Sequence, residues 1–108
     1  MFHVAILLAF AVPAASAQEI AATRGEKVFA AQKCTICHAV ADKGNKKGPL
    51  DDVGSLLSAD EMRQWITRAP EMAAKAKAER KPPMKPFTSL TPAELDDLVA
   101  YLQTLKKR

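Results

Sequence analysis

The chain has 108 residues, a formal net charge of +4 and two cysteines. This length accommodates one small domain and excludes a second. The positive charge favours acidic partners, and no basic helix face alternates with aromatic residues, so we exclude a nucleic-acid-binding protein.

The N-terminal segment is typical of a secretory signal peptide. An apolar run over residues 4–12 is followed by the small residues Ala-Ser-Ala at 15–17, a cleavage site before Gln18. The run is shorter than the roughly 20 apolar residues that span a bilayer, and an uncleaved membrane anchor stays open as an alternative. We predict a signal peptide over residues 1–17, a mature domain over residues 18–108 and a periplasmic location.

Three segments carry the capping-box pattern, in which a hydroxyl accepts from the amide three residues later and a glutamate reaches back. The three pairs are Thr23 with Glu26, Ser58 with Glu61, and Thr91 with Glu94. They predict an all-α fold with helices over about 24–33, over about 59–68 and from residue 92 onward. Pro70 ends or kinks the second helix, and a further short helix is expected over 71–80.

The first and last helices are predicted to cross. Gly25 costs about 1 kcal/mol relative to alanine inside a helix, which indicates either fraying or close approach of another helix. Phe29 lies one turn later on the same face. The last helix offers an apolar face with Leu95, Leu98, Val99, Leu102 and Leu105, and with Tyr101 beside it. We expect Gly25 and Phe29 to meet Leu98, Tyr101 and Leu102.

The segment Cys34-Thr35-Ile36-Cys37-His38 has the spacing of a c-type haem attachment site. Each thiol adds across one vinyl group of the porphyrin, and the two-residue gap lets one turn of chain reach both. The next residue then lies beneath the iron, so His38 is the candidate proximal ligand. The sequence therefore predicts one covalently bound haem c.

Three other uses of two nearby cysteines fit the sequence less well. A thioredoxin-like pair needs a βαβ context, and the sequence near the motif shows no convincing strand. A structural zinc site needs about four ligands, and the mature chain offers only Cys34, Cys37 and His38 as soft ligands. A disulfide across two residues would close too small a loop to stabilise much.

The loop over residues 39–57 shows no helical periodicity and contains Gly48-Pro49-Leu50. The carbonyl of Pro49 stands on a stiffened backbone, and it is a candidate acceptor for the Nδ1–H of His38. The alternative is an ordinary turn proline. Trp65, on the second helix, is a candidate to line the haem pocket with its N–H near a propionate; the alternative is a core tryptophan.

The segment over residues 80–87 has three prolines in five positions and is predicted to be a stiff extended loop. It holds Met84, whose thioether we expect to reach the iron from the side opposite His38. Such Met/His ligation raises the reduction potential. Met72 and Met62 are the rival ligands, although core packing also explains Met62.

Taken together, the haem motif, the Gly-Pro-Leu loop, the methionine loop and the paired terminal helices resemble the class I cytochrome c family, in its small monohaem bacterial form. The resemblance covers residues 24–107. It implies a compact α fold of three to five short helices around one haem. It also implies His38 and Met84 as axial ligands and Pro49 as the acceptor for His38.

The preferred function is periplasmic one-electron transfer by a protein that is not itself an enzyme. Its partners would be a redox donor and acceptor with acidic faces, one of which is membrane-bound if a membrane is involved, and the protein is expected to be a monomer. Two alternatives stay open: a haem subunit of a larger dehydrogenase or oxidase, and a haem-based catalyst or gas sensor with a labile sixth ligand.

Overall fold

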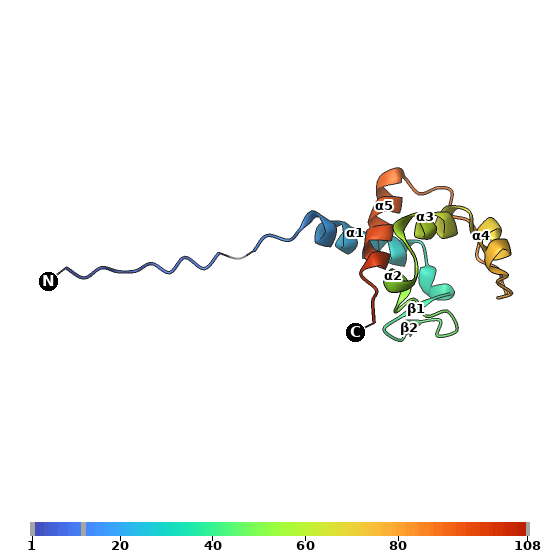
Figure 1. Cartoon of the computed structure of the whole chain (residues 1–108), viewed down its shortest axis with the longest axis horizontal. Coiled ribbons are helices and arrows are strands. Elements are labelled where there is room, and N and C mark those ends of the chain that lie inside the picture. Colours follow the sequence, from blue (N-terminus) through green and yellow to red (C-terminus); the bar gives the residue numbers. More distant parts are fainter. Residues whose placement is uncertain (1, 12, 108) are drawn as a thin grey trace.

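A computed structural model describes residues 2–11 and 13–107. Residues 2–11 and 13–16 form neither helix nor strand and extend away from the packed helices (Figure 1). The elements are α1 (Ala17–Ala31), a 3₁₀ turn (Cys34–Ile36), β1 (Ala39–Val40), β2 (Lys43–Gly44), α2 (Val53–Leu56), α3 (Ala59–Thr67), α4 (Ala69–Ala76) and α5 (Pro92–Gln103). The all-α prediction is therefore confirmed, with a two-stranded hairpin as the only sheet among the described residues.

The crossing of the first and last helices is confirmed. Gly25 is buried, and a Cβ at this position would overlap the backbone carbonyl of Asp97 and come within 2.8 Å of the Tyr101 Cβ. The rings of Phe29 and Tyr101 lie 5.5 Å apart at 60°. Because glycine has no side chain, α1 can approach α5 more closely here than any other residue would allow. Arg24 spans the same crossing with an ion pair to Asp97 at 3.0 Å.

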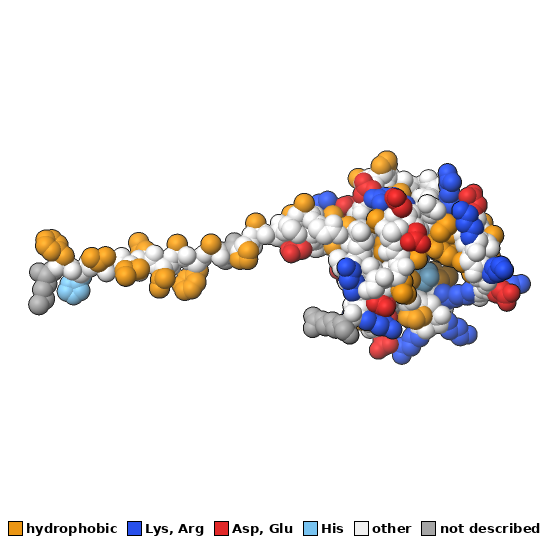
Figure 2. Space-filling model, viewed as in Figure 1, with side chains coloured by type: hydrophobic (Ala, Val, Ile, Leu, Met, Phe, Trp, Pro, Cys, Tyr) orange, Lys and Arg blue, Asp and Glu red, His pale blue; other side chains and the backbone are white. Residues whose placement is uncertain are grey.

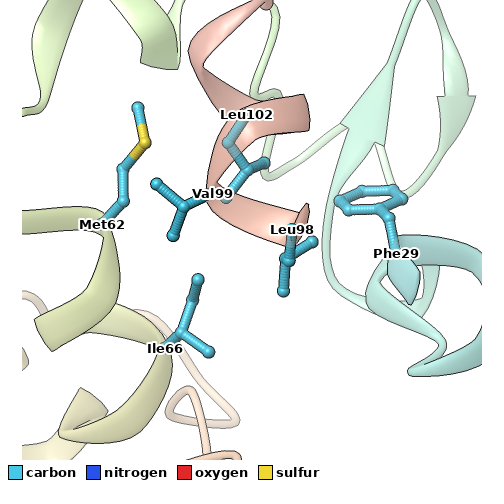
Figure 3. Packing of buried hydrophobic residues seen from close by; sticks show 6 residues of the cluster. All are labelled: Phe29, Met62, Ile66, Leu98, Val99 and Leu102. Atoms are coloured by element: carbon cyan, nitrogen blue, oxygen red, sulfur yellow. The ribbon is translucent and has the colours of Figure 1, made fainter. Parts of the chain in front are cut away.

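The core lies between α1, α3 and α5 (Figure 3). Its buried side chains are Phe29 from α1, Met62 and Ile66 from α3, and Leu98, Val99 and Leu102 from α5. Each is at most 7% exposed. A cluster of six side chains is a small core, as expected for a chain of this length, and such domains commonly need a cofactor or another staple.

The predicted start of the first helix is wrong. Helix α1 begins at Ala17, and the Ser16 hydroxyl caps it by accepting from the Glu19 amide at 3.2 Å. Thr23 lies inside the helix, where its hydroxyl donates to the Glu19 carbonyl at 2.9 Å instead of forming a capping box with Glu26. Ser16 and Glu19 carry the same four-residue spacing about two turns earlier, followed by good helix formers. The predicted cleavage point therefore falls after the first residue of α1; cleavage itself stays a prediction.

The other two capping boxes are present. At α3, the Ser58 hydroxyl accepts from Glu61 and the Glu61 carboxylate accepts from the Ser58 amide; Thr91 and Glu94 do the same at α5. Helix α3 ends at Thr67, and Pro70 stands in the first turn of α4, where its missing N–H costs nothing. Helix α4 occupies Ala69–Ala76 rather than the predicted 71–80, and it ends at Lys77 in a left-handed conformation.

The loop between the haem motif and α3 holds more structure than its lack of periodicity predicted. Strands β1 and β2 pair antiparallel through a two-residue turn, with Ala41 and Asp42 both at positive φ. The short α2 packs beneath the end of α5, because the Gly54 amide donates to the Leu105 carbonyl at 2.8 Å. None of the helices formed by residues 2–11 and 13–107 has the length and apolar character needed to cross a membrane.

Candidate functional site

The segment Cys34–His38 is wound into a single turn at the end of α1. Lys33, in a left-handed conformation at φ 58°, redirects the chain out of α1. The Cys34 carbonyl then accepts from the amides of Cys37 at 3.2 Å and His38 at 2.9 Å. Residues three and four positions apart lie on one face of such a turn. The two thiols and the imidazole therefore lie on the same side of one turn.

The imidazole of His38 is oriented by a backbone carbonyl, but not by the predicted one. Its Nδ1 lies 3.0 Å from the carbonyl oxygen of Gly48, not that of Pro49. The same Gly48 carbonyl also accepts from the Ala39 amide at 3.1 Å, and the Leu50 amide donates to the Ala39 carbonyl at 2.9 Å. These two hydrogen bonds form a short parallel bridge between Ala39 and Pro49. The bridge directs the Gly48 carbonyl toward the motif.

The hydrogen bond settles which nitrogen of His38 is available to a metal. A carbonyl can only accept, so Nδ1 carries the proton and Nε2 keeps its lone pair. Burial lowers the pKa of His38; the bond to Gly48 opposes this shift, and the positive charge of Arg80 adds to it. The neutral imidazole is the form that coordinates iron. Burial also raises the pKa of the Cys34 thiol to about 11.

The motif opens on an apolar cavity with a volume of about 320 Å³. This volume is within the range of cofactor and small-molecule sites. Figure 2 shows a hollow on this face in which a histidine side chain is visible. The cavity is lined by Phe29, Gln32, Cys34, Cys37, His38, Leu50, Val53, Leu57, Met62, Trp65, Ile66, Ala73, Ala78, Arg80, Pro82, Pro83, Met84, Phe87, Leu98 and Leu102. Apart from Arg80, none of these side chains is an acid, a lysine or an arginine.

Of the sequence-predicted site residues, Cys34, Cys37, His38, Met84 and Trp65 line this one cavity. Pro49 does not, and it lines a second cavity that shares Trp65 and three aliphatic side chains with the first.

Two of the three candidate methionines also line the cavity at the haem motif. Met84 is half-buried there, whereas Met62 is only 1% exposed and belongs to the core cluster. Met72, the other rival ligand, is not among the lining residues.

The methionine loop is held at its far end. No helix or strand is formed by residues 77–91, as the prolines predicted. The Phe87 amide donates to the Ile66 carbonyl at 2.8 Å, which gives a partner to one of the carbonyls that α3 leaves unpaired at its C-terminal end. The Phe87 ring packs against the core and carries the Lys85 ammonium 5.5 Å from its centroid. The loop that carries Met84 therefore runs from the end of α4 to Phe87, where it is fixed.

Sequence reasoning missed two residues that hold the motif in place. The Asn45 side chain donates to the Ile36 carbonyl at 3.1 Å. The backbone N–H of Asn45 donates to the carbonyls of Thr35 and His38. Gly44, at φ +110°, passes so close to the His38 carbonyl that a Cβ would overlap it. The Gly-Asn pair is a turn signal, but nothing in the sequence shows that the turn folds back onto residues 35–38.

The alternative uses of the cysteines can be compared with this geometry. Cys34 and Cys37 are free thiols, and the only strands near them among the described residues are the two-residue β1 and β2, which form no βαβ unit. Within residues 2–11 and 13–107, no three His, Cys, Asp or Glu side chains are grouped as metal ligands. The donor set is two thiols and one imidazole on one turn, facing an apolar cavity. Those residues fit a porphyrin attached through two thioethers.

Comparison with known proteins agrees with the site. A sequence model of the family described as Cytochrome c matches residues 22–106. No match was found among curated proteins or among solved structures. The match begins within α1, extends past the end of α5 and includes both cysteines and His38. The chain therefore belongs to the cytochrome c family, whose members carry covalently bound haem c and transfer electrons through it.

Proposed function

We propose that the protein is a periplasmic one-electron carrier whose haem iron is bound axially by His38 and Met84. The observation that carries this proposal is that His38 and Met84 line the same apolar cavity as the two attachment cysteines. A thioether held in a proline-rich loop, beside an imidazole with its Nδ1–H already bonded, gives one soft and one neutral nitrogen donor.

Different residues of the chain have different roles in the proposed site. Burial favours the neutral form of His38, and the Gly48 carbonyl holds the proton on Nδ1, so Nε2 carries no proton and is available to the iron. The loop anchored at Phe87 holds the Met84 thioether at the cavity, and side chains such as Leu98 and Leu102 exclude water from it. Bound haem c supplies a one-electron couple between ferrous and ferric iron. Since both donors belong to the chain, no open position is left for a substrate, and the carrier is not itself an enzyme.

The carrier function is tested by repeated oxidation and reduction of the haem-loaded protein. We expect ascorbate and ferricyanide to convert it through many cycles without loss of signal, with no turnover of peroxide and slow reaction of the reduced form with oxygen. Rapid oxygen uptake or steady peroxide turnover would contradict the carrier assignment and favour a catalyst with a labile sixth ligand.

The proposed partners are redox proteins with acidic docking faces. Six lysines are exposed in or beside the motif, the loop after it and the methionine loop: Lys33, Lys43, Lys46, Lys47, Lys81 and Lys85. Figure 2 shows Lys and Arg side chains beside the hollow. A rim of one charge sign speeds encounter with an oppositely charged surface, and salt screens this effect.

We expect electron transfer to an acidic partner protein to slow by about tenfold or more between low and moderate ionic strength. Stopped-flow rates measured over a salt series check this. Replacing Lys46 and Lys81 together by glutamine should flatten the profile, whereas the matched change at Lys27 and Lys106, outside these segments, should not. A salt-independent rate in the unmodified protein would remove the basic rim from the proposal.

The periplasmic location and the monomeric state are proposed on the N-terminal signal pattern and the single small domain. The intact mass of protein recovered from the periplasmic fraction should equal that of residues 18–108 plus one haem, and its elution volume should be that of a monomer. Recovery of the full-length mass from membranes would favour the uncleaved anchor, and stable co-purification with an oxidoreductase would favour the subunit alternative.

A further inference from the structure

Arg80 is the one formally charged side chain among those that line the cavity at the haem motif. It stands at the start of the methionine loop, four residues before Met84, and its guanidinium lies against Gly48 in the loop that follows the motif. At Gly48, a Cβ would overlap the Arg80 Nη1 and come within 2.9 Å of the Arg80 Cζ. The guanidinium therefore lies directly over the residue whose carbonyl accepts from His38.

Gly48 is needed here for space. It has no positive φ, so its backbone conformation is open to other residues. A side chain at residue 48 would overlap the Arg80 guanidinium and the Cys37 carbonyl. The glycine thus leaves room for the guanidinium beside the residue whose carbonyl orients the His38 imidazole.

The charge of Arg80 is not neutralised by a neighbouring carboxylate. The ion pairs among the described residues join Arg24 to Asp97, Arg63 to Asp60 and Asp96, and Arg68 to Glu71; Arg80 takes part in none. The Arg80 side chain lines an otherwise apolar wall, but it is exposed, so salt screens part of its field. Its charge acts on the His38 ring.

From this placement we propose that Arg80 is a positioning residue that sets the reduction potential of the haem from the His38 side. A cation beside Gly48 draws electron density from the residue that accepts from His38, which makes the imidazole a weaker donor. The same cation disfavours the additional positive charge of the ferric state. Both effects raise the reduction potential. The inference rests on the proposed ligation of iron by His38.

The test compares three variants of the haem-loaded protein with the unmodified chain. Arg80→Gln removes the charge, Arg80→Lys keeps it, and Arg68→Gln removes a charge from an exposed arginine that is paired with Glu71 and does not line the cavity. The measured quantity is the equilibrium constant for electron exchange with a redox dye of known potential, followed in the visible spectrum at low and high salt.

We expect Arg80→Gln to shift this equilibrium toward oxidised protein by about tenfold, which for one electron is about 59 mV. Arg80→Lys and Arg68→Gln should each shift it by less than about threefold. The effect of Arg80→Gln should be larger at low salt than at high salt, because Arg80 is exposed and salt screens an exposed charge.

Two results would overturn the role of Arg80: equal shifts in Arg80→Gln and Arg68→Gln, or equal shifts in Arg80→Gln and Arg80→Lys, which would mean that shape rather than charge matters. Adding carbon monoxide to each reduced variant distinguishes a failure of the Arg80 role from a failure of the proposed axial ligation. Gas binding to Arg80→Gln alone would mean that Arg80 holds the methionine loop, which also overturns the charge role. Gas binding to the unmodified protein would instead contradict the axial ligation itself.

Discussion

Replacing Met84 by alanine is expected to lower the reduction potential and to open the iron to carbon monoxide. The thioether is the soft donor that favours ferrous iron, and alanine offers no donor in its place. Because axial ligands set haem potentials over a range of about 0.8 V, the expected fall is on the order of 0.1 V or more. Spectrophotometric redox titration and the visible spectrum with carbon monoxide measure both effects.

Two matched variants make this result specific to Met84. Met72→Ala removes a methionine that does not line the cavity and should leave potential and gas binding unchanged. Met62→Leu keeps the volume of a residue that lines the cavity but is 1% exposed in the core. If Met62→Leu opens the iron and Met84→Ala does not, Met62 is the sulfur ligand and the methionine loop has another role.

Replacing Gly25 by alanine is expected to destabilise the protein by about 3 kcal/mol. Helix propensity alone predicts the opposite sign, a gain of about 1 kcal/mol. The added methyl group would overlap the Asp97 backbone carbonyl, which belongs to α5 and cannot rotate away as a side chain would. The two helices would have to separate at the Phe29–Tyr101 contact.

Chemical denaturation of the haem-loaded protein, read by circular dichroism, checks this prediction. Ala30→Gly, at an exposed position of the same helix, serves as the control for propensity and should cost about 1 kcal/mol. A Gly25→Ala variant as stable as the unmodified protein, or more stable, would show that α1 and α5 are not in backbone contact at this position.

The helical elements were accessible from the sequence where a local signal coincided with burial. The boxes at Ser58 and Thr91 are satisfied within four residues, so no distant part of the chain is needed to form them. At Thr23 the same pattern gave a wrong start, because Ser16 offered an equivalent cap earlier and helix formation continues through good helix formers once begun. Assigning Ser16 to the signal segment concealed that cap.

The site was predictable where chemistry dictates spacing and less so where loops meet. Two thiols and an imidazole must stand close in the chain to reach one porphyrin, so Cys34, Cys37 and His38 could be read directly. The acceptor for His38 is off by one residue, because the Ala39–Pro49 bridge, which no local pattern shows, orients the Gly48 carbonyl. The role of Arg80 could not be predicted from the sequence, because its contact with Gly48 joins two loops about thirty residues apart in the chain.

The most direct test of the central claim, that His38 and Met84 both bind the iron of an electron carrier, is the visible spectrum of the reduced, haem-loaded protein before and after carbon monoxide is added. The account predicts a low-spin spectrum that the gas leaves unchanged, since the chain fills both axial positions. Ready formation of a carbon monoxide complex by the unmodified protein would contradict it, because the sixth position would then be available for catalysis or sensing.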